Sequence, residues 1–144
     1  MVDIKSNVQI LSRVPLFTGL SEKQLNKLAN RLTKRDYAAG DAIITQGKGG
    51  EGLFVLSEGS AEAIRIQPDG EKITVNTFGP NDFFGELALL DEGLRTASVI
   101  AKTDVTCVIL TRWDFKGILK NEPEMAITML EELAKRFRRA LETL

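Results

Sequence analysis

The chain has 144 residues, enough for one domain with a sizeable core, and its 19 basic and 20 acidic residues give a formal net charge of −1. This balance gives no reason to expect direct binding to nucleic acid. One Cys and no His leave disulfide frameworks and the usual zinc sites unsupported, so no metal and no cofactor are expected. No apolar stretch approaches the ~20 residues that cross a bilayer, and no N-terminal signal is recognisable, so we expect a cytoplasmic protein without a membrane partner.

The N-terminal part, residues 1–33, is expected to be helical. Ser21 followed by Gln24 forms the pattern of a capping box at the start of a helix. The apolar residues behind it recur on one helical face, which makes this helix a packing element. These residues are Leu25, Leu28, Ala29 and Leu32.

Between residues 34 and 111, short apolar runs alternate with turn residues such as Gly40-Asp41 and Pro68-Asp69-Gly70. This spacing is typical of an antiparallel sandwich or barrel. The expected strands are residues 42–45, 53–56, 61–66, 72–77, 96–101 and 105–110. Cys107 lies inside the last run and is expected in the core.

The segment Phe84-Gly85-Glu86-Leu87-Ala88-Leu89-Leu90, followed after four residues by Arg95-Thr96-Ala97-Ser98, is too apolar for an ordinary loop. Gly85 allows backbone to approach a ligand closely, and Glu86 to Leu90 predicts one helical turn whose first N–H groups are free to bind phosphate. Arg95 would supply the countercharge, and Glu86 would accept a hydrogen bond from a sugar hydroxyl. The pattern predicts a phosphate-and-ribose site. The alternative is that Glu86 pairs with Arg95 and the apolar residues are plain core.

Residues 112–144 return to a helical period. A short helix through Leu119 is expected to start at Thr111 or Arg112, and Pro123 suits the first position of a second helix. That helix carries an apolar stripe that packs on its own domain, covers a ligand or pairs with a second subunit. The stripe consists of Ala126, Leu130, Leu133, Phe137, Ala140 and Leu144. A basic cluster of Lys135, Arg136, Arg138 and Arg139 is expected to be a solvated face.

F-G-E-L-A-L-L followed by R-T-A-S resembles the phosphate-binding cassette of the cyclic nucleotide-binding domain family. That family includes regulatory subunits of cyclic-nucleotide-dependent kinases, gated channels and the bacterial catabolite activators. Further matching segments extend the resemblance over nearly the whole chain. They are Leu16-Phe17-Thr18-Gly19-Leu20, Tyr37-Ala38-Ala39-Gly40-Asp41, Gln46-Gly47 and Phe54-Val55-Leu56. Leu94 departs from kinase-type members, which usually have Pro there, and this bears on the rigidity of the loop.

The resemblance implies an α+β fold with a single domain over residues 1–144. N-terminal helices (1–33) would precede a jelly-roll-like antiparallel β-barrel (34–111) that contains the cassette (84–98), and C-terminal helices (112–144) would follow. The implied ligand-binding residues are Gly85, Glu86, Leu87, Ala88, Arg95, Thr96 and Ala97. Candidate contacts to the base are Val75, Leu133, Arg136 and Phe137.

The function implied by the resemblance is a regulatory sensor of cAMP or cGMP that signals by repositioning its C-terminal helices. A homodimer through the last helix is a candidate partner arrangement. The alternatives are a structural or protein-interaction domain with a vestigial pocket, or the sensor fragment of a transcription regulator. An enzyme is not expected, because the chain has no His, no metal-ligand cluster and no nucleophile beside a base. Thr96 bears on base choice, since its hydroxyl can bond the guanine 2-amino group, but cAMP-binding members also carry Ser or Thr there.

Overall fold

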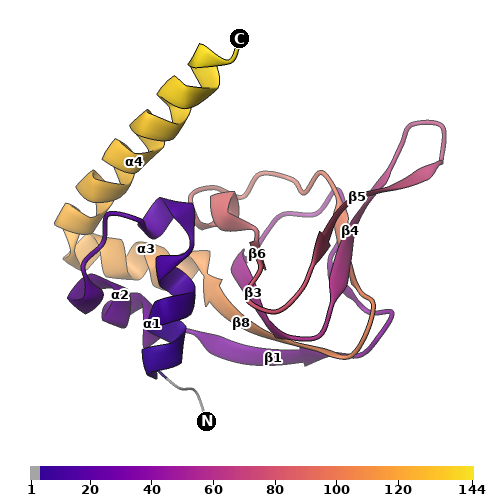
Figure 1. The fold of residues 1–144 in the computed structure, drawn as a ribbon, viewed down its shortest axis with the longest axis horizontal. Coiled ribbons are helices and arrows are strands. Elements are labelled where there is room, and N and C mark those ends of the chain that lie inside the picture. The colour runs from indigo at the N-terminus through magenta and orange to yellow at the C-terminus, as the bar shows by residue number, and fades with distance from the viewer. Residues whose placement is uncertain (1–3) are drawn as a thin grey trace. The chain divides into compact units, whose positions relative to one another are not determined.

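The structure, a computed structural model, describes residues 4–144, which form two compact units. The helical unit joins the described residues up to Leu32 with Trp113–Leu144, and the strand unit is Thr33–Arg112. Figure 1 shows the helices and strands in chain order. The expected class, helices together with an antiparallel sheet structure, is confirmed. Closure of the strands into a barrel stays a prediction.

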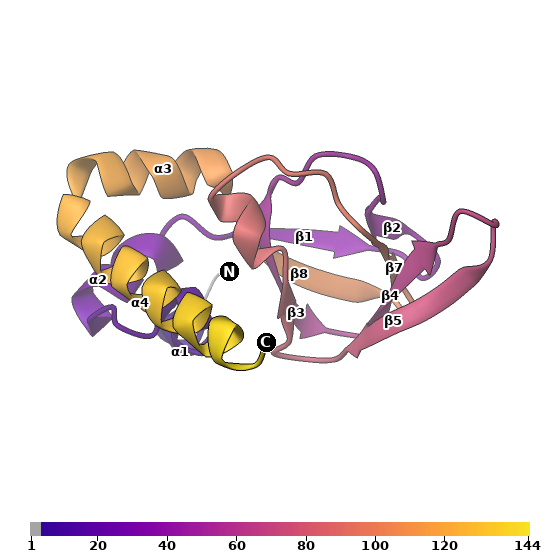
Figure 2. The same cartoon turned by 90° about the horizontal axis from the view of Figure 1, so that it is seen from above.

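The strand unit contains two four-stranded antiparallel sheets, ordered β1-β8-β3-β6 and β2-β7-β4-β5 (Figure 2). The strands are β1 (Thr33–Tyr37), β2 (Ala42–Ile44), β3 (Gly52–Glu58), β4 (Ala61–Ile66), β5 (Lys72–Phe78), β6 (Phe83–Phe84), β7 (Ser98–Ala101) and β8 (Val105–Thr111). Strand β1 pairs with β8, β2 with β7, β3 with β6 and β4 with β5. The first four strands therefore pair in reverse order with the last four. As a result β6 and β7, which flank the predicted cassette, belong to different sheets.

Apolar side chains from both sheets share one core. It includes Ile44, Leu56, Ala63, Val99 and Ile109, together with Cys107, which is buried as expected. At one end of this core the Phe84 ring stacks on Phe54 at a centroid distance of 5.5 Å and lies 5.0 Å from the Phe78 ring. Because Phe84 immediately precedes Gly85, this aromatic cluster anchors the start of the cassette.

Strands β1 and β6 were not predicted. The β1 sequence Thr-Lys-Arg-Asp-Tyr has no alternation of apolar and polar residues, and Thr33 to Asp36 are exposed. It is a strand because it pairs with β8 over the register from Thr33↔Ile109 to Tyr37↔Val105. Strand β6 has two residues and pairs only with β3. Neither strand has a local signal, because both depend on partners distant in the sequence.

The helical unit contains α1 (Ile4–Ser12), the 3₁₀ turn η1 (Pro15–Phe17), α2 (Glu22–Ala29), α3 (Arg112–Asn121, which starts at the unit boundary) and α4 (Pro123–Glu142). The predicted capping box of α2 is present: the Gln24 N–H donates to Ser21 Oγ at 3.2 Å, and the Ser21 N–H donates to Gln24 Oε1 at 2.9 Å. Pro123 lies in the first turn of α4, as predicted. Within residues 4–144 no helix combines the length and apolar character needed to span a membrane.

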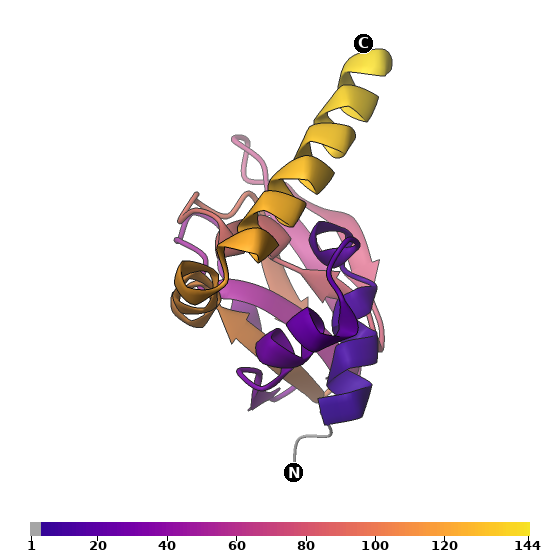
Figure 3. The ribbon, with the colours of Figure 1, turned by 90° about the vertical axis from the view of Figure 1, so that its left-hand side faces the viewer.

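Helix α4 packs within its unit through a different face from the predicted stripe. Met125 and Met129 are buried, whereas Leu130 and Phe137 of the stripe are 64% and 65% exposed. Figure 3 shows that α4 extends well beyond α1, α2 and α3 toward the C-terminus. The sequence left three interpretations of this stripe open, and one of them was that the stripe packs on its own domain. The structure does not show the whole stripe packed within this unit.

Candidate functional site

The predicted cassette forms a glycine turn followed by one short helical turn. Gly85 has φ = 84°, a left-handed conformation that residues with a side chain rarely adopt, and it opens the 3₁₀ turn η2 (Glu86–Leu89). Glu86 and Ala88 are buried, while Leu87 is 60% exposed. The expectation of free N–H groups needs one correction: the Ala88 N–H donates to the Gly85 carbonyl at 3.0 Å, because a 3₁₀ turn closes one residue earlier than an α-helix.

Arg95 lies in a slot formed by glycines. A Cβ atom on Gly50 would lie 2.6 Å from Arg95 Cζ, and one on Gly85 would lie 2.9 Å from its Nη2. Nη2 donates to the Gly52 carbonyl at 3.2 Å, and this is a long-range contact between β3 and the segment that leads into β7. The sequence analysis indicated Gly85 for the site but did not indicate Gly50 or Gly52.

Arg95 is a cation that does not use all of its hydrogen-bond donors. Its Nε atom is buried and has no hydrogen-bond partner among the described residues. Burial lowers the pKa of Arg95 below its ordinary value, and the negative charge of Glu51 opposes that shift. A buried donor without an acceptor is costly, so an acceptor-rich anion bound here would relieve that cost.

A cavity of about 360 Å³ opens beside Arg95 within the strand unit. Its walls come from β2, β4, β5, β7 and the two ends of the cassette. The lining residues are Ile44, Ala63, Arg65, Val75, Asn76, Phe78, Phe84, Gly85, Arg95, Thr96, Ala97 and Val99. Five residues predicted for the site are thus brought together, namely Gly85, Arg95, Thr96, Ala97 and Val75. The remaining predicted base contacts, Leu133, Arg136 and Phe137, lie on α4 in the helical unit.

Two arginines at the cassette were not predicted. Arg112 is buried and donates through Nη1 to the carbonyls of Gly50 at 2.7 Å and Ala88 at 3.3 Å, so it ties the Arg95 slot to η2. Arg65 lines the cavity, and its Nε donates to the Thr96 carbonyl at 3.3 Å. A signal for Arg65 existed: in β4 it follows Ala61 and Ala63 at spacing two, so it interrupts the small-residue face of that strand.

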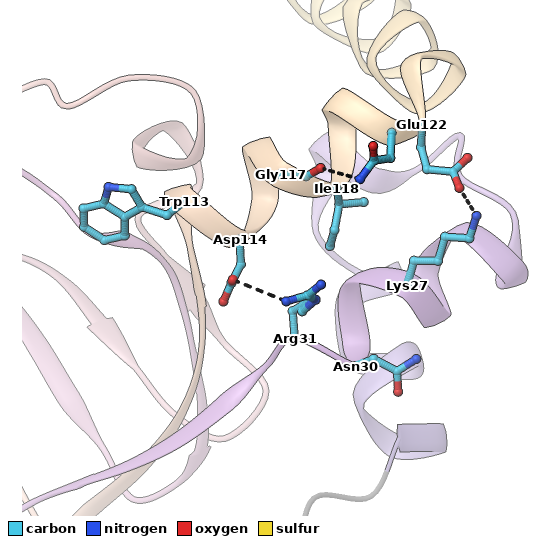
Figure 4. Close-up of a pocket in the computed structure, with 9 residues that line it drawn as sticks. Lys27, Asn30, Arg31, Trp113, Asp114, Gly117, Ile118 and Glu122 are labelled. Atoms are coloured by element: carbon cyan, nitrogen blue, oxygen red, sulfur yellow. Dashed lines mark hydrogen bonds and ion pairs between the residues drawn. The ribbon is translucent and has the colours of Figure 1, made fainter.

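A second, larger cavity of about 470 Å³ lies in the helical unit between α2 and α3 (Figure 4). Its charged side chains are paired with one another: Lys27 with Glu122, and Arg31 Nη1 with Asp114 Oδ1 at 3.8 Å. Asn121 Nδ2 donates to the Gly117 carbonyl at 3.5 Å. None of the residues predicted for the ligand site lines this cavity, whereas five of them line the cavity beside Arg95.

Comparison with known proteins gives one family. The family model described as "Cyclic nucleotide-binding domain" matches residues 34–122, more than half of the chain. A CRP-like cAMP-activated global transcriptional regulator of Mycobacterium tuberculosis is 31% identical over 131 residues, which cover 91% of this chain and 58% of that protein. A cAMP-dependent protein kinase regulatory subunit of Aspergillus fumigatus is 42% identical over 109 residues, covering 76% of this chain and 26% of that protein.

The fold agrees with these sequence matches. The N-terminal domain of a transcriptional regulator from Streptomyces coelicolor A3(2) superposes with a TM-score of 0.86 at 33% identity, covering 94% of this chain and 96% of that one. The chain spans only 58% and 26% of the two curated relatives, so the activities of those whole proteins do not transfer with the match. The family model describes a binding domain, and these two relatives are a transcriptional regulator and a kinase regulatory subunit, which agrees with the expectation that this chain is not an enzyme.

Proposed function

The chain belongs to the cyclic nucleotide-binding domain family, and from this premise we propose that residues 1–144 act as one cytoplasmic sensor domain for cAMP, or for cGMP. The binding site is the cavity beside Arg95, in a strand unit that we expect to close as a jelly-roll-like barrel. The expected ligand-contacting residues are Gly85, Glu86, Leu87, Ala88, Arg95, Thr96 and Ala97.

The observation that supports this proposal most strongly is the state of Arg95. Its guanidinium borders the cavity, is positioned by Gly50, Gly52 and Gly85, and keeps one buried N–H without an acceptor. A cyclic phosphate placed there would accept hydrogen bonds from Arg95 and from backbone N–H groups at the start of η2. Glu86, buried beside Gly85, would accept a hydrogen bond from the ribose 2′-hydroxyl. The site would therefore bind phosphate and sugar through separate groups.

We assign the signalling step to the C-terminal helices. A binding site becomes a switch only if some element has a different free energy in the empty and the filled state. Helix α4 is the candidate, because much of its apolar stripe is exposed, including Leu130 and Phe137. On ligand binding, Leu133, Arg136 or Phe137 would shield the base while Val75 contacts it from β5. In a homodimer the same stripe would pair with that of a second copy.

A second candidate function is a structural or protein-interaction domain with a vestigial pocket, and a third is the sensor part of a transcription regulator. The second predicts that the chain binds neither cyclic nucleotide. The third keeps the same site and the same ligand, and differs only in what the signal controls. The two cyclic nucleotides are therefore the first ligands to test.

Isothermal titration calorimetry with cAMP and cGMP tests the proposal. Truncating one partner of a buried charged contact costs about 2–5 kcal/mol, so Arg95→Ala should weaken binding by roughly 30-fold to several thousandfold. Arg13→Ala removes an exposed arginine of the helical unit and is the charge-matched control. Unchanged affinity in Arg95→Ala would refute the site assignment, and no binding by the unmodified chain would favour the vestigial pocket.

A further inference from the structure

The cavity beside the cassette contains a second guanidinium that the phosphate does not require. A 3′,5′-cyclic nucleotide carries one negative charge, and Arg95 already supplies one positive charge next to the cassette. Arg65 lines the same cavity from β4. Among the residues that line it there is no Asp or Glu to pair with either arginine. Since the phosphate is assigned to Arg95 and the cassette, the Arg65 guanidinium is available for a neutral part of the ligand.

Arg65 is held in place through one of its five N–H groups only. Its Nε donates to the Thr96 carbonyl at 3.3 Å, which orients the guanidinium plane beside the residue that follows Arg95. Its two terminal nitrogens have no hydrogen-bond or ion-pair partner among residues 4–144. The result is a planar pair of donors, fixed at its base and open at its tip, next to a predicted ligand contact.

A neighbouring side chain in the cavity also presents a donor. Asn76 Oδ1 accepts a hydrogen bond from the Thr77 N–H at 2.8 Å, so the unused group of this amide is its NH₂. Arg65 and Asn76 come from the adjacent strands β4 and β5, and both line the cavity with Val75, the predicted base contact. The polar side chains on these two strands thus offer hydrogen-bond donors to a base.

Donors discriminate between the two purines. Guanine presents two acceptors, O6 and N7, on one edge, and an arginine fork matches both, whereas adenine presents a donor, its 6-amino group, beside N7. An arginine facing adenine would place donor against donor. Hypoxanthine has the same O6 and N7 as guanine but lacks the 2-amino group.

We propose that Arg65 is a specificity-determining residue of this site and selects a cyclic nucleotide with a 6-oxopurine base, guanine or hypoxanthine, over cAMP. The inference rests on the proposed function, because it assumes that a cyclic nucleotide occupies the cavity. It is separate from the role of Thr96, whose hydroxyl would act on the guanine 2-amino group.

The test is calorimetry on the full chain with cAMP, cGMP and inosine 3′,5′-cyclic monophosphate (cIMP). Since cAMP and cIMP both lack the 2-amino group, the ratio of their dissociation constants reports on position 6 of the base alone. Arg65→Met keeps an unbranched side chain but removes the donors, and should shift this ratio toward cAMP about tenfold or more. Arg65→Lys keeps the charge but loses the fork, and should shift the ratio in the same direction. Thr96→Ala should leave the ratio unchanged and reduce preference for cGMP over cIMP about fivefold.

Each outcome distinguishes the inference from the function on which it rests. Binding of all three ligands with an unchanged cAMP-to-cIMP ratio in Arg65→Met would overturn the role of Arg65 and leave the sensor function standing. An equal loss of affinity for all three ligands in that variant would also overturn it, because Arg65 would then act on the phosphate. No binding of any of the three by the unmodified chain would overturn the sensor function and this inference together. Circular dichroism of each variant confirms that the exposed Arg65 was changed without loss of the fold.

Discussion

Arg95 depends on glycines that lie more than forty positions away in the sequence, and one of them can be tested directly. A Cβ atom on the buried Gly50 would lie 2.6 Å from Arg95 Cζ, Nε and Nη2. Gly50→Ala should therefore displace the guanidinium and weaken cyclic nucleotide binding about tenfold or more, since a misplaced charged contact loses much of its strength. Gly49→Ala is the matched control, because its Cβ would meet only the Glu92 carbonyl at 3.5 Å, an ordinary contact. Equal affinities of the two variants in calorimetry would show that the slot does not position Arg95.

Glu86 gives a second prediction at this scale. Hydrogen bonds that involve a charged group contribute about 1.5–3 kcal/mol, so Glu86→Ala should weaken binding very roughly tenfold to a hundredfold. Most of this loss should be absent when the ligand is 2′-deoxy-cAMP, because the proposed hydrogen bond is then missing in both proteins. Calorimetry with both ligands on both proteins forms a double-mutant cycle. An additive cycle would mean that Glu86 does not contact the 2′-hydroxyl.

At the scale of the element, two glycines of the helical unit predict opposite effects on stability. Gly117 lies inside α3, and a Cβ there would meet nothing within 4 Å, so Gly117→Ala should stabilise the protein by about 0.5–1 kcal/mol through helix propensity. A Cβ on Gly19 would lie 2.7 Å from Thr128 Cγ2 of α4, so Gly19→Ala should destabilise by about 1–3 kcal/mol. Thr128 has little freedom to move, because its hydroxyl donates to the Glu124 carbonyl at 3.1 Å. Urea unfolding curves would show midpoints on opposite sides of that of the unmodified chain.

The two variants would not shift the urea midpoint in opposite directions if α4 packed only loosely near Gly19. Gly19→Ala would then leave the midpoint where it is, and the short contact at Thr128 would carry no energetic weight. Such a result would also bear on signalling, since a helix held weakly in its N-terminal part at Thr128 would be free to move as a whole.

For the whole molecule, the question is whether ligand binding in the strand unit changes the state of α4. A ligand shifts an equilibrium only by its differential affinity for the two states, so binding at the cassette must change the free energy of the moving element. We expect amide hydrogen exchange of residues 124–144 to slow when cAMP is added, and Arg95→Ala to abolish that change. Equal protection with and without ligand, under conditions where calorimetry shows binding, would mean that α4 is a fixed packing or dimer element.

The features that the sequence predicted correctly are those whose cause is local. The capping box at Ser21 and Gln24 joins groups three residues apart, and β4 was predicted with its observed bounds, 61–66, because its flanking turn residues mark both ends. The turn at Glu86 was predicted for the same reason, since Gly85 supplies the left-handed backbone that opens it. The contiguous cassette pattern also indicated Arg95, Thr96 and Ala97, which line one cavity, and their contact with a ligand stays a prediction.

The sequence by itself determined the family, the helical and strand regions and the short contiguous segment that carries the cassette, because neighbouring residues encode those features in their spacing and backbone preferences. Only the tertiary structure showed that β1 is a strand, that Gly50 and Gly52 contact Arg95, and that Arg112, at the start of α3, and Arg65, on β4, reach the cassette. These contacts join residues that are distant in the sequence, from 24 positions apart for Ala88 and Arg112 to 76 positions apart for Thr33 and Ile109. The backbone preferences of neighbouring residues do not encode such a pairing, because it forms only when the folded sheets bring the ends of distant strands together.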